Sequence, residues 1–223
     1  MDAVIKIGGS LGANPPVLRK LCETIGALAE KYQLLVVPGG GEFADVVREI
    51  DKRYSLSPSA AHRMAILGMD QYGLLLRDIT PNSREVQTLA EARSVSQAGE
   101  VPILLPSLLI FGEKPFEASW NVTSDSIAAY VANRVNAPRL VLATDVDGIF
   151  NCDPKLNSNA KLLAEVQATE ILKRKVRTSV DRYLPKVLLE AGVDCFVING
   201  AYPERIEAVL ANKTTLCTHI LSK

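Results

Sequence analysis

The sequence has no excess of charge of either sign, because 25 lysine and arginine residues balance 25 aspartate and glutamate residues. A protein that binds nucleic acid through the phosphate backbone needs a basic surface, so we expect no nucleic-acid partner. Aromatic residues make up only 5% of the chain, too few for a surface on which bases stack. A local cationic site for a small anion is still compatible with this composition.

Long apolar runs and paired cysteines are also absent. No stretch approaches the roughly 20 apolar residues of a membrane-spanning helix. The first residues, Met1–Val4, place no basic region ahead of an apolar stretch, so we expect neither a membrane segment nor a signal peptide. Because Cys22, Cys152, Cys195 and Cys217 are far apart and form no CxxC pair, a zinc or thioredoxin-like site is disfavoured. We expect four free thiols in a cytoplasmic protein.

Short β-branched runs alternate with amphipathic stretches along the whole chain, which is long enough for one sizeable core. This alternation predicts an α/β fold, in which right-handed crossovers build a mainly parallel sheet with helices on both faces. We predict strands at 3–7, 34–37, 101–105, 140–143 and 194–198, and a last edge strand at 216–220. Helices are predicted near 15–32, 43–50, 57–76, 89–97, 183–191 and 203–210, with further helices starting at 124 and ending before 173.

Two glycine-rich turns follow the first two predicted strands, as Gly8-Gly9-Ser10 after Lys6 and as Gly39-Gly40-Gly41 after Pro38. Ligands of open α/β sheets bind beyond the carboxyl ends of strands. Each turn offers unobstructed backbone amides beside a helix N-terminus, which is a favourable place for an anion. Two such turns suggest two phosphate-bearing groups, although the glycines could also serve only tight turns. Neither turn matches the P-loop or the dinucleotide-binding fingerprint.

Three further segments could carry chemistry. Thr123-Ser124-Asp125 precedes a predicted helix, where helix capping alone would also explain these residues. Thr144–Phe150 places two aspartates directly after an apolar strand, where they face the same crevice, although a plain turn would also explain them. Lys186 begins a predicted helix, where a cation is unfavourable to the helix dipole and hints at a nearby anion.

Taken in order, these segments resemble the amino acid kinase family from Ile5 to about Ile206. The resemblance implies a three-layer αβα sandwich. It also implies that Lys6 and Lys186 flank the transferred phosphoryl group while Asp125 orients them. The implied ATP-binding residues are Gly8, Gly9, Ser10, Thr144, Asp145, Asp147, Gly148, Phe150 and Asp153. The implied acceptor-binding residues are Gly39, Gly40, Gly41, Asn121, Thr123 and His62, of which His62 could instead be a packing residue.

The same resemblance implies a single domain over residues 1–223, with an acceptor-binding part at about 1–135 and a nucleotide-binding part at about 136–223. It implies at least a homodimer. It also implies ATP with Mg²⁺ held on the ATP oxygens and no metal ligand from protein side chains. The usual Gly-Met pair ahead of the second lysine is Tyr183-Leu184 here, so the sequence departs from the family beside Lys186.

The residues around the second glycine turn bear on the acceptor. Pro38–Asp45, together with His62–Ile66 and Met69–Tyr72, looks most like a small group of the family in one-carbon metabolism. That group converts aminomethyl-furanmethanol phosphate to its diphosphate in methanofuran-type cofactor synthesis. The alternatives are a carboxylate acceptor of the amino acid or acetylglutamate type, a uridylate or isopentenyl phosphate acceptor, and a non-catalytic nucleotide or oxyanion binder. In each case we expect cations and amides to converge on one crevice, with the compensating acids elsewhere.

Overall fold

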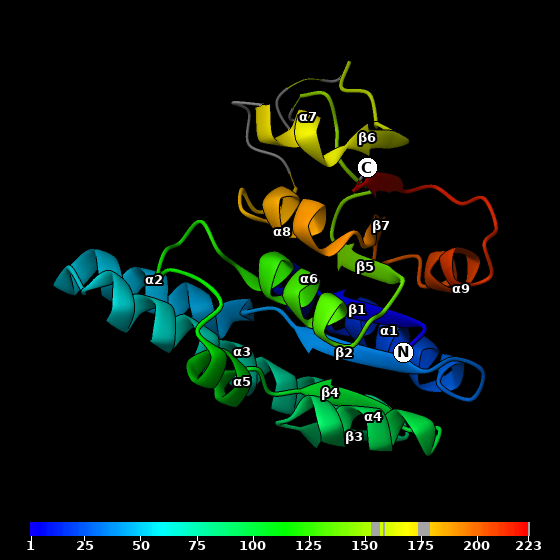
Figure 1. Cartoon of the computed structure of the whole chain (residues 1–223), viewed down its shortest axis with the longest axis horizontal. Coiled ribbons are helices and arrows are strands. Elements are labelled where there is room, and N and C mark those ends of the chain that lie inside the picture. Colours follow the sequence, from blue (N-terminus) through cyan, green and yellow to red (C-terminus); the bar gives the residue numbers. More distant parts are fainter. Residues whose placement is uncertain (153–156, 158, 174–178, 223) are drawn as a thin grey trace.

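The computed structural model describes residues 1–152, 157, 159–173 and 179–222 (Figure 1). These residues form one eight-stranded sheet in the order β3-β4-β2-β1-β5-β7-β8-β6. Neighbouring strands run parallel except for the antiparallel pair β7 and β8. The strands are β1 (Ala3–Ile7), β2 (Leu34–Pro38), β3 (Ser83–Val86), β4 (Val101–Leu104), β5 (Arg139–Thr144), β6 (Glu165–Gln167), β7 (Asp194–Asn199) and β8 (Thr218–Leu221).

Three of the helices begin at a residue whose side chain caps the first turn. Asn14 accepts a hydrogen bond from the Val17 amide ahead of α1, Ser57 accepts one from the Ala60 amide ahead of α3, and Thr88 forms a capping box with α4. The helices are η1 (Gly9–Ala13), α1 (Pro15–Leu28), α2 (Gly41–Tyr54), α3 (Pro58–Ile79), α4 (Leu89–Gln97), α5 (Ser107–Glu113), α6 (Ser124–Arg134), α7 (Ala168–Lys173), α8 (Leu184–Ala191) and α9 (Glu204–Leu210).

Two hydrophobic cores cover the two faces of the sheet, because successive side chains of a strand point to opposite sides. Ala3, Ile5 and Ile7 of β1 pack in the core that contains α1 and α9. Val4 packs in the other core, with α4, α6 and α8. Lys6 shares the face of Val4, so the alternation alone directs this lysine toward α6 (Figure 1). The three-layer αβα arrangement and the mainly parallel sheet are confirmed.

Most predicted elements are confirmed with shifts at their ends, but one placement is wrong. The last strand, β8, does not lie at an edge, since it is inserted between β7 and β6. The true edges are β3 and β6, and neither was predicted from the sequence. The helix α5 was also not predicted. Both edge strands are short and carry exposed polar residues, so they lack the apolar run that marks a buried strand.

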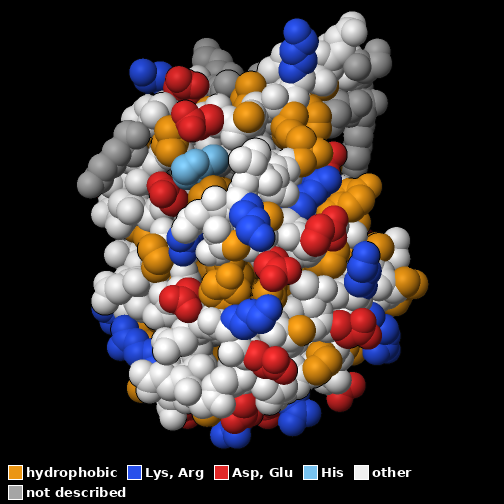
Figure 2. Space-filling view, turned by 90° about the vertical axis from the view of Figure 1, so that its right-hand side faces the viewer, with side chains coloured by type: hydrophobic (Ala, Val, Ile, Leu, Met, Phe, Trp, Pro, Cys, Tyr) orange, Lys and Arg blue, Asp and Glu red, His pale blue; other side chains and the backbone are white. Residues whose placement is uncertain are grey.

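The distribution of surface charge bears on the prediction that the protein has no nucleic-acid partner. Figure 2 shows acidic and basic side chains interspersed over the face that lies to the right in Figure 1, with no patch of one sign.

Cys22, Cys152, Cys195 and Cys217 are all free thiols, as predicted. Burial raises the pKa of Cys22 to about 11. Within the described ranges, no helix has the length and apolar character needed to cross a membrane.

Candidate active site

The two glycine turns interlock at the carboxyl ends of β1 and β2, where Ile7 pairs with Pro38. A Cβ atom on Gly9 would lie 2.3 Å from the amide nitrogen of Gly41, and one on Gly39 would lie 2.6 Å from the amide nitrogen of Gly9. Gly41 also has a φ of +54°, which favours glycine. Only glycine therefore allows the two turns to approach this closely.

The amides of these turns are available to a ligand. Within the described residues, the amides of Gly9, Ser10, Gly40 and Gly41 donate to no protein acceptor. Gly41 starts α2, so the helix dipole adds partial positive charge at the same place. This is the combination of groups that binds phosphates and carboxylates in other proteins.

A cavity of about 370 Å³ opens in front of the turns. Its walls come from β1, the two turns, α2, α3 and the segment that leads into α6. The side chains that line it include Lys6, Asp45, Arg48, His62, Ile66, Met69, Trp120 and Thr123. The cavity thus combines an amide-lined end with an apolar wall and a few charged groups, which is the usual make-up of a small-molecule site.

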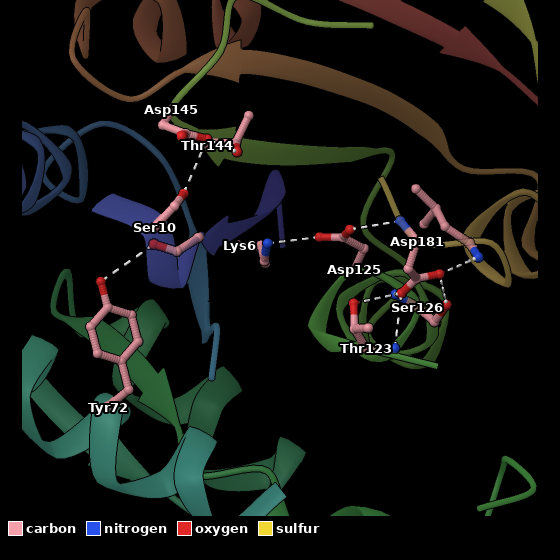
Figure 3. Close-up of polar contacts among 11 residues, drawn as sticks. Lys6, Ser10, Tyr72, Thr123, Asp125, Ser126, Thr144, Asp145 and Asp181 are labelled. Carbon is pink, nitrogen blue, oxygen red and sulfur yellow. Dashed lines mark hydrogen bonds and ion pairs between the residues drawn. The ribbon is translucent and has the colours of Figure 1, made fainter. Parts of the chain in front are cut away.

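Lys6 is held at this cavity by Asp125 (Figure 3). Lys6 Nζ lies 2.7 Å from Asp125 Oδ1, and the two side chains are only 11% and 9% exposed. Asp125 stands in the first turn of α6, and its Oδ2 accepts a hydrogen bond of 3.0 Å from the Asp181 amide. A buried lysine needs such a partner to stay charged. The pair therefore presents a fixed cation next to the glycine amides.

Asp181 is a central residue of the site that we did not identify in the sequence. Its Oδ2 accepts hydrogen bonds from the amide and hydroxyl of Thr123 and from the Ser126 amide. Its Oδ1 accepts from the Ser126 hydroxyl and from the Tyr183 and Leu184 amides. One carboxylate thereby satisfies the N-termini of both α6 and α8 (Figure 3). Burial and the charge of Asp125 raise the pKa of Asp181.

This arrangement changes the interpretation of the segment before α6. Thr123 is the N-cap residue of α6, but its side chain makes no capping hydrogen bond of its own and donates to Asp181 instead. The local sequence carries little signal for Asp181, since it stands two residues before Tyr183, the N-cap residue of α8, and not at the capping position itself. What the sequence did not reveal is that the same carboxylate also serves a second helix.

The predicted nucleotide residues lie at the carboxyl end of β5. Asp145 accepts hydrogen bonds of 3.2 Å from the hydroxyls of Ser10 and Thr144, which ties this strand end to η1 (Figure 3). Asp147 forms an ion pair of 2.6 Å with Arg205, a residue of α9 that we also did not identify in the sequence. The Arg205 side chain is 11% exposed, so Asp147 is tethered to α9.

The remaining residues of the predicted nucleotide group follow Asp147. Gly148 has a φ of +152°, and a Cβ atom there would lie 2.4 Å from Thr218 Oγ1, so glycine is required. Phe150 forms an isolated antiparallel bridge with Leu162. The predicted residue Asp153 lies outside the described residues.

The structure does not bring every predicted residue to the cavity. Lys186 is exposed in the first turn of α8, where its Nζ donates to the Tyr183 hydroxyl at 3.2 Å, and it does not line the 370 Å³ cavity. That hydrogen bond raises the pKa of Lys186. Asn121 lines an adjoining cavity of about 310 Å³, and His62 lines both cavities. Burial lowers the pKa of His62, which is half-buried.

The predicted distribution of charge is partly wrong. Cations and amides do converge on one cavity, but their compensating acids lie beside them and not elsewhere. Lys6 pairs with Asp125, and Arg48 pairs with Asp45 while its guanidinium stands 5.1 Å from the Trp120 ring centre. For Lys6 the physical reason is desolvation, because a cation withdrawn from water is costly unless an acid is close to it. Arg48 and Asp45 are exposed, and they meet because they stand three residues apart on α2.

Known proteins resemble this chain over its full length. A [5-(aminomethyl)furan-3-yl]methyl phosphate kinase of Methanocaldococcus jannaschii is 35% identical over 218 residues, which is 98% of this chain and 97% of the relative. A uridylate kinase of Methanococcoides burtonii is 26% identical over 236 residues, covering 96% of each chain. The relatives are kinases by name.

Solved structures share the fold. The crystal structure of uridylate kinase from Archaeoglobus fulgidus matches with a TM-score of 0.77 over 99% of this chain and 100% of that chain, at 22% identity. UMP kinase from Bacillus anthracis matches with a TM-score of 0.78 over 99% and 96%, at 18% identity. Residues 1–199 match the amino acid kinase family. With this match and the full-length relative at 35% identity, the chain belongs to the amino acid kinase family.

Proposed function

We propose that this protein is an ATP-dependent phosphotransferase whose acceptor is itself a phosphate. The observation that carries the proposal is the pair of interlocked glycine turns, whose unpaired amides stand beside the charged Lys6. Two phosphate-bearing ligands on adjacent strand ends would bring a donor and an acceptor phosphate together. The relatives support a phosphate acceptor, since both named relatives are phosphate or uridylate kinases.

The acceptor that we propose is aminomethyl-furanmethanol phosphate, with its diphosphate as product. The relative at 35% identity over 98% of this chain supports this choice, and the second relative, a uridylate kinase, is less similar at 26%. The cavity also supports it. A volume of about 370 Å³ suits a small ring, Ile66 and Met69 offer an apolar wall, and the carboxylate of Asp45 could meet a substrate amine.

In the proposed reaction, an oxygen of the acceptor phosphate attacks the γ-phosphorus of ATP, the bond to the β-phosphate oxygen breaks, and ADP leaves. A phosphate monoester has a second pKa of about 6, so near neutral pH the acceptor is already a nucleophile and needs no general base. The work of the protein is then alignment and charge neutralisation. Lys6 would supply a cation to the oxygens of the transferred group, and the glycine amides would hold the flanking phosphates.

The proposal includes magnesium as a companion of ATP, held on the ATP oxygens. Among the residues that the structure describes, no three histidine, cysteine or acidic side chains gather as a metal site, and Asp125 and Asp147 are already paired with Lys6 and Arg205. In the proposal the ATP phosphates hold Mg²⁺, which prefers oxygen ligands and neutralises phosphate charge. Asp125 is left free to orient Lys6.

The division of the chain into an acceptor part at about 1–135 and a nucleotide part at about 136–223 belongs to the same proposal. ATP would lie along the end of β5, and the acceptor against α2 and α3. Lys186 is part of the proposed catalytic set, and it would have to release the Tyr183 hydroxyl to reach the transferred group. The proposed ATP residues are Gly8, Gly9, Ser10, Thr144, Asp145, Asp147, Gly148, Phe150 and Asp153, and the proposed acceptor residues are Gly39, Gly40, Gly41, Asn121, Thr123 and His62.

The test is an ATP-consumption assay with the furan phosphate, UMP, isopentenyl phosphate and N-acetylglutamate as separate acceptors, with products identified by phosphorus NMR. We expect the furan diphosphate to form with the highest kcat/KM. A preference for UMP would overturn the acceptor, and an acyl phosphate trapped by hydroxylamine would overturn the phosphate class. Nucleotide binding without transfer to any acceptor would favour a non-catalytic binding protein.

A further inference from the structure

Tyr72 is a buried polar side chain to which the proposed reaction assigns no role. It stands on the inner face of α3 and is only 2% exposed. Its hydroxyl lies 3.4 Å from the carbonyl oxygen of Gly8, to which it donates a long hydrogen bond (Figure 3). A buried tyrosine hydroxyl normally finds a partner, and here the partner is the backbone of the first glycine turn.

The ring of Tyr72 also lies close to the second turn and to η1, which follows the first turn. A Cβ atom on Gly41 of the second turn would lie 3.2 Å from the ring, and one on Gly12 of η1 would lie 3.5 Å from it. The hydroxyl and the ring of one rigid side chain therefore stand beside the first turn, η1 and the second turn. Because Gly9 and Gly41 also interlock directly, the ring fixes the distance between two segments that are far apart in the sequence.

The hydrogen bond from the Tyr72 hydroxyl also bears on the Gly9 N–H, which lies on the other side of the Gly8–Gly9 peptide bond. In a trans peptide the carbonyl and the following N–H point in opposite directions. The Gly8 carbonyl faces Tyr72, so the Gly9 N–H points away from Tyr72. Gly9 lines the cavity, and its amide has no acceptor within the described part of the chain. The hydroxyl, together with the Leu11 amide that donates to the same carbonyl, thus holds the direction of one of the amides that face the ligand.

We propose that Tyr72 is a positioning residue, which sets the spacing of the two glycine turns and the direction of the Gly9 amide toward the transferred phosphoryl group. The part that concerns phosphate rests on the proposed function. The part that concerns the amide direction stands on the geometry alone and can be tested without a substrate.

The hydroxyl can be removed without leaving a buried group unpaired. The Gly8 carbonyl also accepts a hydrogen bond of 3.2 Å from the Leu11 amide, so Tyr72→Phe should fold and keep the ring contacts. Tyr32→Phe is a matched control, because Tyr32 is a partly buried tyrosine at the edge of the same core and does not line the cavity. Both variants lose one oxygen atom.

The experiment measures kcat and KM for ATP and for the acceptor, together with the ¹⁵N–¹H shift of the Gly9 amide in the substrate-free protein. Removal of a fixed amide donor lowers kcat by about 100-fold or more in other enzymes, so loosening one should lower it by about fivefold. In Tyr72→Phe we expect this fall with both KM values nearly unchanged, and a shifted Gly9 resonance. Tyr32→Phe should leave all of these values unchanged.

A role in folding alone would lower the melting temperature of Tyr72→Phe while kcat and the Gly9 resonance stayed at their wild-type values. That result would overturn the proposal. So would a lowered kcat with an unmoved Gly9 amide, because the effect would then not pass through this peptide. If the wild-type protein transferred phosphate to no acceptor, the proposed function would fail, yet the Gly9 shift would still decide whether Tyr72 directs the amide.

Discussion

Lys6 is a buried cation whose only anionic partner among the described residues is Asp125, at 2.7 Å. Replacing Lys6 with methionine keeps the length of the side chain and removes the charge, which leaves the Asp125 carboxylate uncompensated. We expect the free energy of unfolding to fall by about 3 kcal/mol, as in other buried pairs that lose one partner. We also expect kcat to fall by at least about 100-fold, because a charge that faces the transferred group is lost.

Chemical denaturation and steady-state kinetics of Lys6→Met measure the two effects. Lys20→Met serves as the control, because Lys20 is an exposed lysine on α1 and should tolerate the change. A Lys6→Met protein with normal turnover would contradict the placement of Lys6 at the reacting phosphate.

His62 gives the stability of the protein a dependence on pH. Burial lowers its pKa below the ordinary value of 6.5 in the folded state, so the unfolded chain takes up a proton first as the pH falls. The contribution of His62 to stability is therefore complete above pH 6.5 and is lost progressively between 6.5 and the lowered folded pKa. The variant His62→Gln should lose less stability than the wild type over this range.

Denaturant melts of the wild type and His62→Gln at a series of pH values between about 7.5 and 5 check this. The other histidine of the chain, His219, provides the comparison through His219→Gln. An equal loss of stability in the wild type and in His62→Gln over that range would show that the folded protein does not disfavour the charged imidazole.

The residues of the site differ in how far the sequence could predict them. Lys6 and Asp125 stand in local motifs, directly before a glycine turn and at a helix start, so each carries a recognisable context. Asp181 and Arg205 act on partners 56 and 58 residues away, on Asp125 and Asp147. Such contacts depend on how β5, α6, α8 and α9 pack, which no local pattern encodes.

At the scale of elements, the Asp181 carboxylate joins the N-termini of α6 and α8. Loss of one helix cap typically costs about 1 kcal/mol, so Asp181→Ala, which removes two, should lower the free energy of unfolding by about 2 kcal/mol. The amide of residue 181, which donates to Asp125, remains in this variant but is held less firmly without the carboxylate, and kcat should fall because Lys6 is less well oriented.

Thr88→Ala is the matched control for this change. Thr88 caps only α4, in a capping box with Glu91, and does not line the cavity. We expect a loss of about 1 kcal/mol in its unfolding free energy and an unchanged kcat. Equal kcat values for Asp181→Ala and Thr88→Ala would show that joining the two helices has no part in catalysis.

The elements that the sequence predicted well are those with strong internal patterns. The predicted range of α4 matches the structure, since its capping box and apolar spacing agree. The edge strand β3 (Ser-Arg-Glu-Val) has only one buried residue, so its strand character comes from pairing with β4 and not from its own pattern. The position of β8 depends likewise on β6, a three-residue strand that pairs with it in parallel.

At the scale of the whole molecule, the outer face of α3 exposes leucines that a monomer would leave in water. Leu67, Leu74 and Leu75 are 48%, 50% and 42% exposed, and their spacing places them on one side of the helix. Val46 of the adjacent α2 is 54% exposed. The family resemblance implies at least a homodimer, and we propose this face as the contact between two copies of the chain.

The variant Leu74→Glu places a charge in the proposed contact and should convert the protein to a monomer, because burying an unpaired carboxylate opposes association. Sedimentation velocity at several protein concentrations measures the change. Leu189→Glu, which alters a leucine that is 36% exposed on α8, should not affect the oligomeric state. A wild-type protein that sediments as a monomer at all concentrations would refute the proposed dimer.

The central place of β1 in the sheet also determines when the site can form during synthesis. Its pairing with β2 needs only residues up to 38, but its pairing with β5 needs residues up to 144. A nascent chain can therefore bring its two glycine turns together early, while Lys6 still lacks Asp125 and Asp181. The charged part of the site is completed only after most of the protein has left the ribosome. Ligands can therefore stabilise the finished fold but cannot assist its first steps.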